Sequence, residues 1–263
     1  MSLLQAIVLG AVQGLTEFLP ISSSAHLYIV PTLLHWPYAG VAFDVALHWG
    51  TLVALLIAFG RDWIELARNL FSSDEAERLA ARDTWLKLIA ASVPAAIAGV
   101  LLEGASERML RQLPIQVVTL VVFGFLLWWV DRVRPKGKPV RTPGWGACLA
   151  MGFAQALALV PGVSRSGVTI TAGRWFGVER VSAARFSFML ATPITLGAGL
   201  LELRHLPKDL AAAPIACGVI TAAIVGLLAI RGLLRWLGRA GFGVFFAYRA
   251  ALAAVLIAVI LRG

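Results

Sequence analysis

The sequence predicts an all-α polytopic membrane protein with an inverted-topology repeat, six transmembrane helices and two re-entrant helical hairpins. Three observations predict this fold class. The 263 residues are 59% hydrophobic and only 14% charged, far more apolar than an average soluble domain. Six apolar stretches are long enough to cross a bilayer of about 30 Å. One polar pattern occurs twice, as GAVQGLTEFLPISSSAH at 10–26 and as GFAQALALVPGVSRSGVT at 152–169.

The six expected spans lie at approximately 43–60, 85–103, 115–131, 184–203, 213–230 and 244–261. The two motif regions differ from them. A proline followed by serines breaks each apolar run into two arms of roughly 14 to 17 residues, so each motif predicts a hairpin that enters and leaves on one side. A break at membrane depth needs protein or water around the freed backbone groups. We therefore expect the two hairpin tips to be buried together.

The duplicated pattern predicts the domain organisation. Its copies align at a constant offset, with Gly10, Gln13, Ser22 and Ser24 matching Gly152, Gln155, Ser164 and Ser166. Phe43 and Gly50 also match Phe186 and Pro193. We expect a single integral membrane domain over 1–263, with a first repeat half at 1–133, a basic linker at 132–143 and a second half at 144–263.

Charge placement predicts the orientation in the membrane. Three crossings in each half force the second half to be inverted, and the basic residues between spans then divide twelve to five. The positive-inside rule assigns the side with twelve to the cytoplasm and leaves both termini outside. The twelve are Arg61, Arg68, Arg78, Arg82, Arg132, Arg134, Lys136, Lys138, Arg141, Arg231, Arg235 and Arg239, and the five are Arg108, Arg111, Arg204, Lys208 and Arg262.

Other function classes are disfavoured by the same composition. The net charge is +9, but the basic residues lie between apolar segments and lack an aromatic platform or binding signature. We therefore expect no nucleic-acid partner. Cys148 and Cys217 lie in apolar runs, which indicates neither a disulfide framework nor a metal cluster. The N-terminal apolar stretch carries Gln13 and Glu17 and lacks a cleavage site, so we do not expect a removable signal peptide.

The first hairpin carries an acid, hydroxyls and an imidazole. Gln13 and Glu17 are four residues apart, on one face of the first arm. Ser22, Ser23 and Ser24 begin the second arm, where hydroxyls cap a helix and free N–H groups hold an anion, and His26 follows within a turn. An acid inside a membrane is a functional candidate, and His26 beside it favours acid–base chemistry. The alternatives are a Glu17 that meets water at the interface and a hydrogen-bonded core His26.

The second hairpin carries Ser164, Arg165, Ser166 and Thr169 after Pro161 and Gly162. A guanidinium at a helix start favours phosphate binding, whereas the alternative is an arginine that extends to the membrane surface. Inverted halves would bring the two tips together as a phosphoryl-transfer site. Asp44 and His48, one turn apart, could bind metal or relay protons, but we favour a local hydrogen-bonded pair near the interface.

These motifs resemble those of the undecaprenyl pyrophosphate phosphatases, the bacitracin-resistance type of membrane enzyme. QGLTE (13–17), FLPISSSAH (18–26) and PGVSRSGVT (161–169) carry the resemblance, together with FDVALHWGT and ARFSFMLATP. It implies hydrolysis of undecaprenyl pyrophosphate to undecaprenyl phosphate and inorganic phosphate. It also implies location in the bacterial cytoplasmic (inner) membrane, where the lipid carrier is recycled for peptidoglycan and other envelope polymers.

The resemblance also implies roles for individual residues. Ser23 corresponds to the nucleophile, Glu17 to an essential acid, His26 to the catalytic histidine and Arg165 to the phosphate-binding arginine, with Ser22, Ser164, Ser166 and Thr169 around the diphosphate. The family depends on Mg²⁺ or Ca²⁺, for which Glu17 and Gln13 are the expected ligands. Gln13 stands where many members have Glu, and SSSAH stands where some relatives have SSTGH.

The sequence leaves several alternatives open. Glu17 and His26 could exchange roles, and water could attack the phosphorus directly instead of Ser23. Inverted repeats with broken helices also occur in secondary transporters, and a structural or assembly protein is a further class. The lipid substrate and membrane lipids are the expected partners, and a homodimer is an alternative to a monomer.

Overall fold

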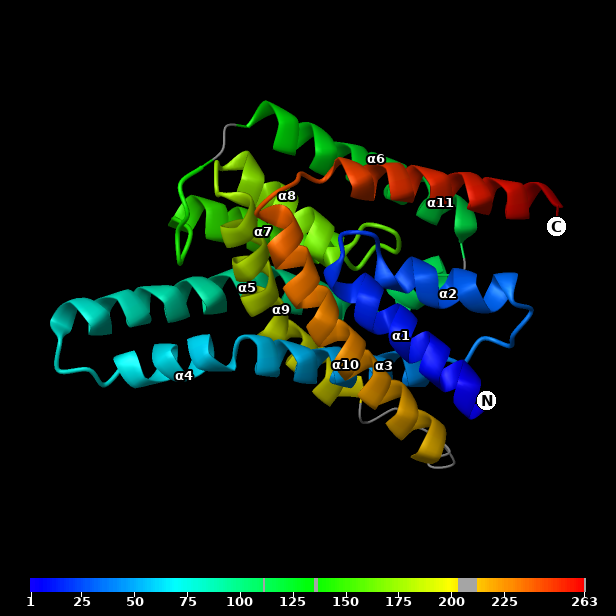
Figure 1. Ribbon diagram of the computed structural model, residues 1–263, viewed down its shortest axis with the longest axis horizontal. Helices are drawn as coiled ribbons and strands as arrows, with labels where there is room; N and C mark the ends of the chain where they lie inside the picture. Colours follow the sequence, from blue (N-terminus) through cyan, green and yellow to red (C-terminus); the bar gives the residue numbers. More distant parts are fainter. Residues whose placement is uncertain (111, 135–136, 203–211, 263) are drawn as a thin grey trace.

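The computed structural model describes residues 1–110, 112–134, 137–202 and 212–262, without the side chains of 103–110, 202 and 262. Over these ranges the chain is helical, with no strand. The helices are α1 (Leu3–Phe18), α2 (Ser23–Leu33), α3 (Val41–Ala58), α4 (Gly60–Asn69), α5 (Glu75–Leu110), α6 (Leu113–Val133), α7 (Trp145–Leu157), α8 (Arg165–Trp175), α9 (Arg180–Glu202), α10 (Ala212–Leu237) and α11 (Gly243–Arg262) (Figure 1).

The six expected spans are confirmed as long apolar helices. They are Val41–Ala58, Glu75–Leu102, Leu113–Val133, Arg180–Leu201, Ala212–Leu237 and Gly243–Leu261. Their surfaces expose large apolar side chains, among them Leu101, Val118 and Ile220. Because such surfaces are stable against lipid and not against water, the protein is a multi-pass membrane protein.

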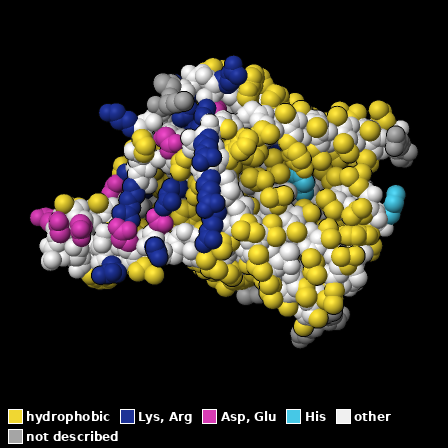
Figure 2. Space-filling view, in the orientation of Figure 1, with side chains coloured by type: hydrophobic (Ala, Val, Ile, Leu, Met, Phe, Trp, Pro, Cys, Tyr) yellow, Lys and Arg dark blue, Asp and Glu magenta, His cyan; other side chains and the backbone are white. Residues whose placement is uncertain are grey.

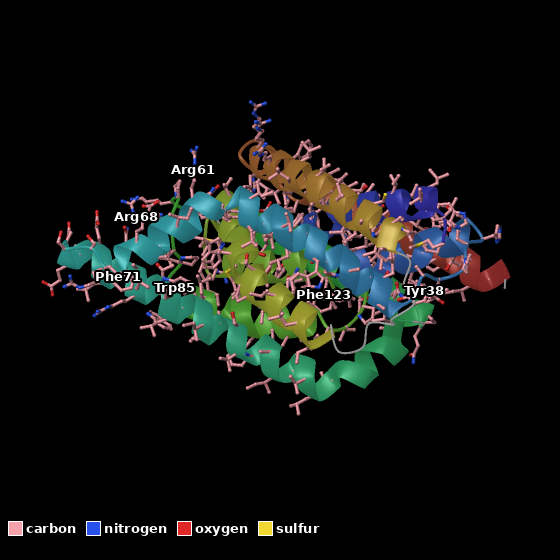
Figure 3. The ribbon with its side chains drawn as sticks, turned by 90° about the horizontal axis from the view of Figure 1, so that it is seen from below. Tyr38, Arg61, Arg68, Phe71, Trp85 and Phe123 are labelled. Atoms are coloured by element: carbon pink, nitrogen blue, oxygen red, sulfur yellow. The ribbon has the colours of Figure 1, made fainter. Side chains whose placement is uncertain are left out.

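The helix pair α4–α5 extends further than the sequence predicted. The sequence predicted a span from about residue 85, but α5 begins at Glu75 because the polar residues before that span are also helical. α4 was not predicted; it buries Leu66 and carries charged residues on its other face. The Trp63 and Trp85 ring centroids lie 5.5 Å apart and join the two helices. Figure 3 shows Arg61 and Arg68 projecting from α4 at this end of the molecule.

Two helical hairpins, α1–α2 and α7–α8, occupy the motif regions. Their first arms have 16 and 13 residues, whereas both second arms have 11, shorter than predicted. The second arms end early because the chain turns into left-handed backbone soon after each, at His35 (φ 54°) and Gly177 (φ 79°), where a helix stops. That the hairpins are re-entrant in a bilayer stays a prediction.

Glycines let the first arm of each hairpin pack closely on a long helix. A Cβ atom at Gly10 of α1 would lie 2.4 Å from the Gly218 carbonyl oxygen in α10, and a Cβ atom at Gly152 of α7 would lie 2.4 Å from the Ala91 carbonyl oxygen in α5. Small residues allow this approach between membrane helices. Each hairpin therefore packs on a helix of the other predicted half, although the boundaries of the halves stay a prediction.

Charge and termini lie at opposite ends of the molecule. Figure 2 shows Lys and Arg side chains gathered toward the end where α4 and the start of α5 project, whereas Figure 1 places both termini at the other end. Of the basic residues used to predict orientation, Arg111, Lys136, Arg204 and Lys208 lie outside the described residues, as do the side chains of Arg108 and Arg262. The assignment of the termini to the outer side stays a prediction.

Candidate active site

A cavity of about 300 Å³ lies between the two hairpin tips, α3 and α9. The tips contribute acid, hydroxyl and guanidinium groups, whereas α9 and α5 contribute mainly small and apolar side chains. The lining residues are Glu17, Ser22, Ser23, Ser24, Val45, His48, Ala95, Gln155, Ala158, Leu159, Ser164, Arg165, Ile194, Thr195, Ala198 and Gly199.

The backbone of both tips has the same unusual geometry. Ser22 and Ser164 have φ of 74° and 72°, a region that costs a residue other than glycine about 1–3 kcal/mol. The next residues, Ser23 and Arg165, begin α2 and α8. The Ser164 hydroxyl accepts from the Gly167 N–H at 3.2 Å, and the Ser22 hydroxyl lies 3.2 Å from that of Ser24. The strained turns direct two helix N-termini, with their free N–H groups, toward the cavity region.

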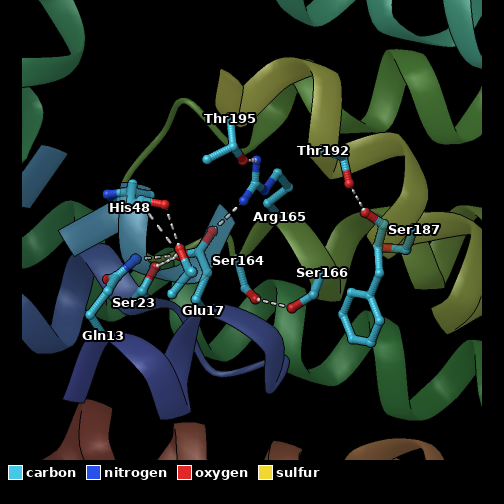
Figure 4. A network of polar contacts seen from close by, with 12 residues as sticks. Gln13, Glu17, Ser23, His48, Ser164, Arg165, Ser166, Ser187, Thr192 and Thr195 are labelled. Atoms are coloured by element: carbon cyan, nitrogen blue, oxygen red, sulfur yellow. Dashed lines mark hydrogen bonds and ion pairs between the residues drawn. The ribbon is translucent and has the colours of Figure 1, made fainter. Parts of the chain in front are cut away.

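Glu17 joins the two tips. Its Oε1 forms an ion pair with Nη2 of Arg165, and its Oε2 accepts hydrogen bonds from the Ser23 hydroxyl at 2.5 Å and from Gln13 Nε2 at 3.1 Å (Figure 4). Glu17 is only 8% exposed, so its charge depends on these partners. The expected meeting of the acidic tip and the guanidinium tip is present in the structure.

Arg165 is held from the opposite side by α9. Its Nη1 donates to the Thr195 hydroxyl at 2.6 Å while Nη2 contacts Glu17 (Figure 4). Two directional contacts orient the planar guanidinium at the cavity wall. Thr195 was not identified from the sequence, because nothing in its local pattern separates it from other threonines on apolar helices.

Ser166 and Thr169 lie behind the cavity lining. The Ser166 hydroxyl donates to the Leu19 carbonyl at 3.3 Å, which joins the two tips. The Thr169 hydroxyl donates to the Arg165 carbonyl at 2.7 Å and lies 2.6 Å from the Ser187 hydroxyl. Of the residues predicted around the diphosphate, Ser22, Ser164 and Arg165 line the cavity. Ser166 and Thr169 brace the start of α8.

His26 is also outside the lining. Its Nδ1 lies 2.7 Å from the Ser22 carbonyl and, because a carbonyl only accepts, this nitrogen carries the proton. Its Nε2 lies 2.7 Å from the Tyr248 hydroxyl of α11, and the two rings stack with centroids 5.6 Å apart. Both ring nitrogens therefore have partners, and the imidazole links the Ser22 turn to α11. A catalytic role for His26 stays a prediction.

His48 lines the cavity, in contrast to His26. Its Nδ1 donates to the Asp44 backbone carbonyl at 2.8 Å, and its Nε2 lies 3.6 Å from Glu17 Oε2 (Figure 4). The Asp44 carboxylate instead accepts from the Tyr38 hydroxyl at 2.6 Å. The expected local hydrogen-bonded pair of Asp44 and His48 is therefore present, but it runs through the Asp44 backbone carbonyl, and the imidazole faces Glu17.

Arg249 of α11 is a further residue that the sequence analysis missed. It is fully buried and donates to backbone carbonyls of both tips, including Pro20 at 3.3 Å and Gly162 at 2.6 Å. It also donates to the Leu120 carbonyl of α6 at 2.9 Å. One guanidinium thus fixes both tips relative to each other. The sequence signal that could have identified Arg249 is its position as a lone arginine inside an apolar run.

Two oxygen donors near the cavity could hold the expected divalent cation. Glu17 supplies a carboxylate, and the buried Gln13 Oε1 has no hydrogen-bond partner among the described residues; hard oxygens of this kind suit Mg²⁺ or Ca²⁺. The described residues contain no group of three or more His, Cys, Asp or Glu side chains placed to hold a metal. The donors fit a cation that takes most of its ligands from water and a phosphorylated substrate.

The fold and this site define an integral membrane protein in which two helical hairpins enclose one polar pocket built on a buried carboxylate–guanidinium pair. Residues 6–255 match the family model described as "Bacitracin resistance protein BacA". The chain belongs to this family.

Curated relatives match over almost the whole chain. A protein of Moorella thermoacetica is 48% identical over 259 residues, which cover 98% of each chain. A protein of Pelotomaculum thermopropionicum is 46% identical over 98% of this chain and 97% of its own, and one of Desulforudis audaxviator is 44% identical over 98% of both. Each of the three is named undecaprenyl-diphosphatase.

Proposed function

We infer that this protein is an undecaprenyl-diphosphatase. It hydrolyses undecaprenyl pyrophosphate to undecaprenyl phosphate and inorganic phosphate, which recycles the lipid carrier of envelope synthesis and confers bacitracin resistance. The family match and the full-length relatives support this function. The structural observation that carries it is the convergence of Ser23 and Arg165 on Glu17 at one cavity within a membrane protein.

The charge arrangement suits a diphosphate. Arg165 presents a guanidinium at the cavity wall, and α2 and α8 begin at the two tips, where N–H groups and the positive end of each helix dipole favour an anion. Glu17 neutralises Arg165 in the absence of substrate. We propose that the terminal phosphoryl group takes over the guanidinium contact, while the prenyl chain lies among the apolar helices.

Ser23 and Glu17 are arranged for nucleophilic attack. The Ser23 hydroxyl donates to Glu17 Oε2, so the carboxylate is positioned to take this proton as Oγ attacks the terminal phosphorus. The P–O bond to undecaprenyl phosphate then breaks. Water cleaves the phosphoserine, and its oxygen remains on inorganic phosphate while Ser23 regains a proton. His26 supports the Ser22 turn in this scheme.

Glu17 and Gln13 would hold the divalent cation. When bound, Mg²⁺ or Ca²⁺ supplies neutralisation of the negative charge of the diphosphate. We further propose that the protein lies in the bacterial cytoplasmic membrane with both termini outside, as the concentration of Lys and Arg at the opposite end of the molecule supports (Figure 2).

The test is phosphate release from undecaprenyl pyrophosphate by protein purified in detergent, where no gradient can drive transport. We expect activity in the wild type and its loss in Glu17→Ala and Arg165→Ala. The matched controls are Glu65→Ala and Arg141→Ala, which break an exposed ion pair outside the cavity and should keep activity. Full activity of both site variants would refute this site, and an inactive wild type would favour a transporter.

A phosphoenzyme experiment separates the two routes of attack. Brief turnover with substrate labelled in the terminal phosphate should place label on the peptide that contains Ser23, and Ser23→Ala should abolish it. Turnover without labelled protein would show that water attacks directly.

A further inference from the structure

Gln155, near the end of α7, has a buried side chain without a partner. It is 3% exposed and lines the cavity. Neither Oε1 nor Nε2 has a hydrogen-bond partner in the part of the chain that the structure describes. Buried amides in folded proteins almost always have one. An unpaired amide beside a cavity therefore indicates a group that the cavity binds.

The internal repeat explains why the partner is missing. Gln155 aligns with Gln13, whose Nε2 donates to Glu17 one helical turn further on. The second copy reads QALAL where the first reads QGLTE, so the residue one turn after Gln155 is Leu159. Leu159 also lines the cavity, and it offers no acceptor. The Nε2 donor of the amide is thus satisfied inside the first hairpin, whereas the Nε2 donor inside the second hairpin has no partner among the described residues.

The wall around Gln155 identifies the chemistry of the missing partner. Arg165 and Ser164 line the same cavity, and the cavity of about 300 Å³ has room for a diphosphate head group with several waters. Phosphate oxygens only accept hydrogen bonds, and Nε2 of an amide only donates. Because the Arg165 guanidinium makes this wall favour an anion, the acceptor that best complements Gln155 Nε2 is a phosphate oxygen.

We propose that Gln155 is a substrate-binding residue whose amide N–H donates to a non-bridging oxygen of the bound diphosphate, while its carbonyl accepts from a cavity water. This proposal rests on the proposed function. It gives the second hairpin two ligands for the substrate, a charged one in Arg165 and a neutral one in Gln155.

The test uses full-length protein and the variants Gln155→Leu and Gln155→Glu. Leucine removes the donor but fills the space, so we expect KM for undecaprenyl pyrophosphate to rise about tenfold or more. Glutamate places a negative charge against the diphosphate and should raise KM further. The control is Thr192→Val, a buried polar group of α9 that bonds the Phe188 carbonyl and is absent from the lining; its KM should be unchanged.

Thermal melting separates a binding role from a structural one. Without ligand, Gln155→Leu should melt at or above the wild-type temperature, because no protein contact is lost. The stabilisation by inorganic pyrophosphate with Mg²⁺ should be reduced. An unchanged KM, a variant that fails to fold, or an unchanged response to pyrophosphate each overturns the proposal. An inactive wild type contradicts the proposed function alone, since the pyrophosphate response still tests Gln155.

Discussion

The two hairpin tips share one backbone conformation but carry different chemical groups. Ser22 and Ser164 have φ values of 74° and 72° at aligned positions, and the residues that follow, Ser23 and Arg165, both contact Glu17 on different oxygens. A hydroxyl and a guanidinium thus come from equivalent positions of the repeat. The difference teaches that one backbone conformation at two aligned positions serves different chemical roles, which the side chain after each turn decides.

The largest expected effect comes from removing the contact between the tips. Arg165→Met should lower activity by about 10²- to 10³-fold or more, because it removes the charge that stabilises the transferred phosphoryl group. It also leaves the Glu17 carboxylate buried without its guanidinium partner, which should destabilise the protein by about 3–5 kcal/mol. Melting in detergent and phosphate release measure the two effects.

The double variant Glu17→Gln/Arg165→Met sharpens this comparison. It should be inactive but melt above Arg165→Met, because no unpaired charge remains. If the single and double variants melt together, the ion pair does not join the tips.

Arg249 holds the two tips together, so its loss should affect both. Arg249→Met leaves carbonyls of Pro20 and Gly162 without their donor and should destabilise the protein by about 3 kcal/mol or more. Arg235, an exposed residue of α10, is the matched control, and Arg235→Met should stay within about 0.5 kcal/mol of the wild type. Denaturant or thermal unfolding in detergent measures both; equal melting of the two variants would contradict the role of Arg249.

The aligned glutamines offer a test of the cation. Gln13→Glu adds a carboxylate beside Glu17 and should lower the Mg²⁺ concentration for half-maximal activity by about tenfold, since charged oxygens bind Mg²⁺ more tightly. Gln155→Glu should not lower it. Mg²⁺-dependent stabilisation against heat provides a second readout. An unchanged or raised Mg²⁺ requirement in Gln13→Glu would exclude Gln13 as a ligand.

The smallest effects are expected from the shared backbone. Ser22→Gly and Ser164→Gly should each change stability by less than about 1 kcal/mol, because relief of the left-handed backbone offsets the lost hydroxyl contacts. Ser22→Val and Ser164→Val should each destabilise by more than that, since β-branched residues tolerate positive φ poorly. Thermal unfolding compares the four. A valine tolerated at one tip only would show that the tips do not share this strain.

Local rules explain which features were predictable. Long apolar runs predicted the six spans because each helix must match the bilayer thickness by itself. Prolines followed by serines predicted both hairpins, and the motif residues Glu17 and Arg165 were found because charge is rare inside a membrane. The length of α5 and the existence of α4 were missed, because their polar sequences lack a membrane-length apolar run, and the contacts between α4 and α5 that stabilise them are tertiary.

The sequence by itself determined the helices, the duplication and the residue types available at each tip. Only the tertiary structure decided which side chains face the cavity: His48, Thr195 and Gln155 rather than His26, Ser166 and Thr169. It also brought Arg249 to the tips. The physical reason is that successive residues of an α-helix point about 100° apart. The rotation of each helix against its neighbours therefore selects the residues that meet, and that rotation is set by packing between segments far apart in the chain.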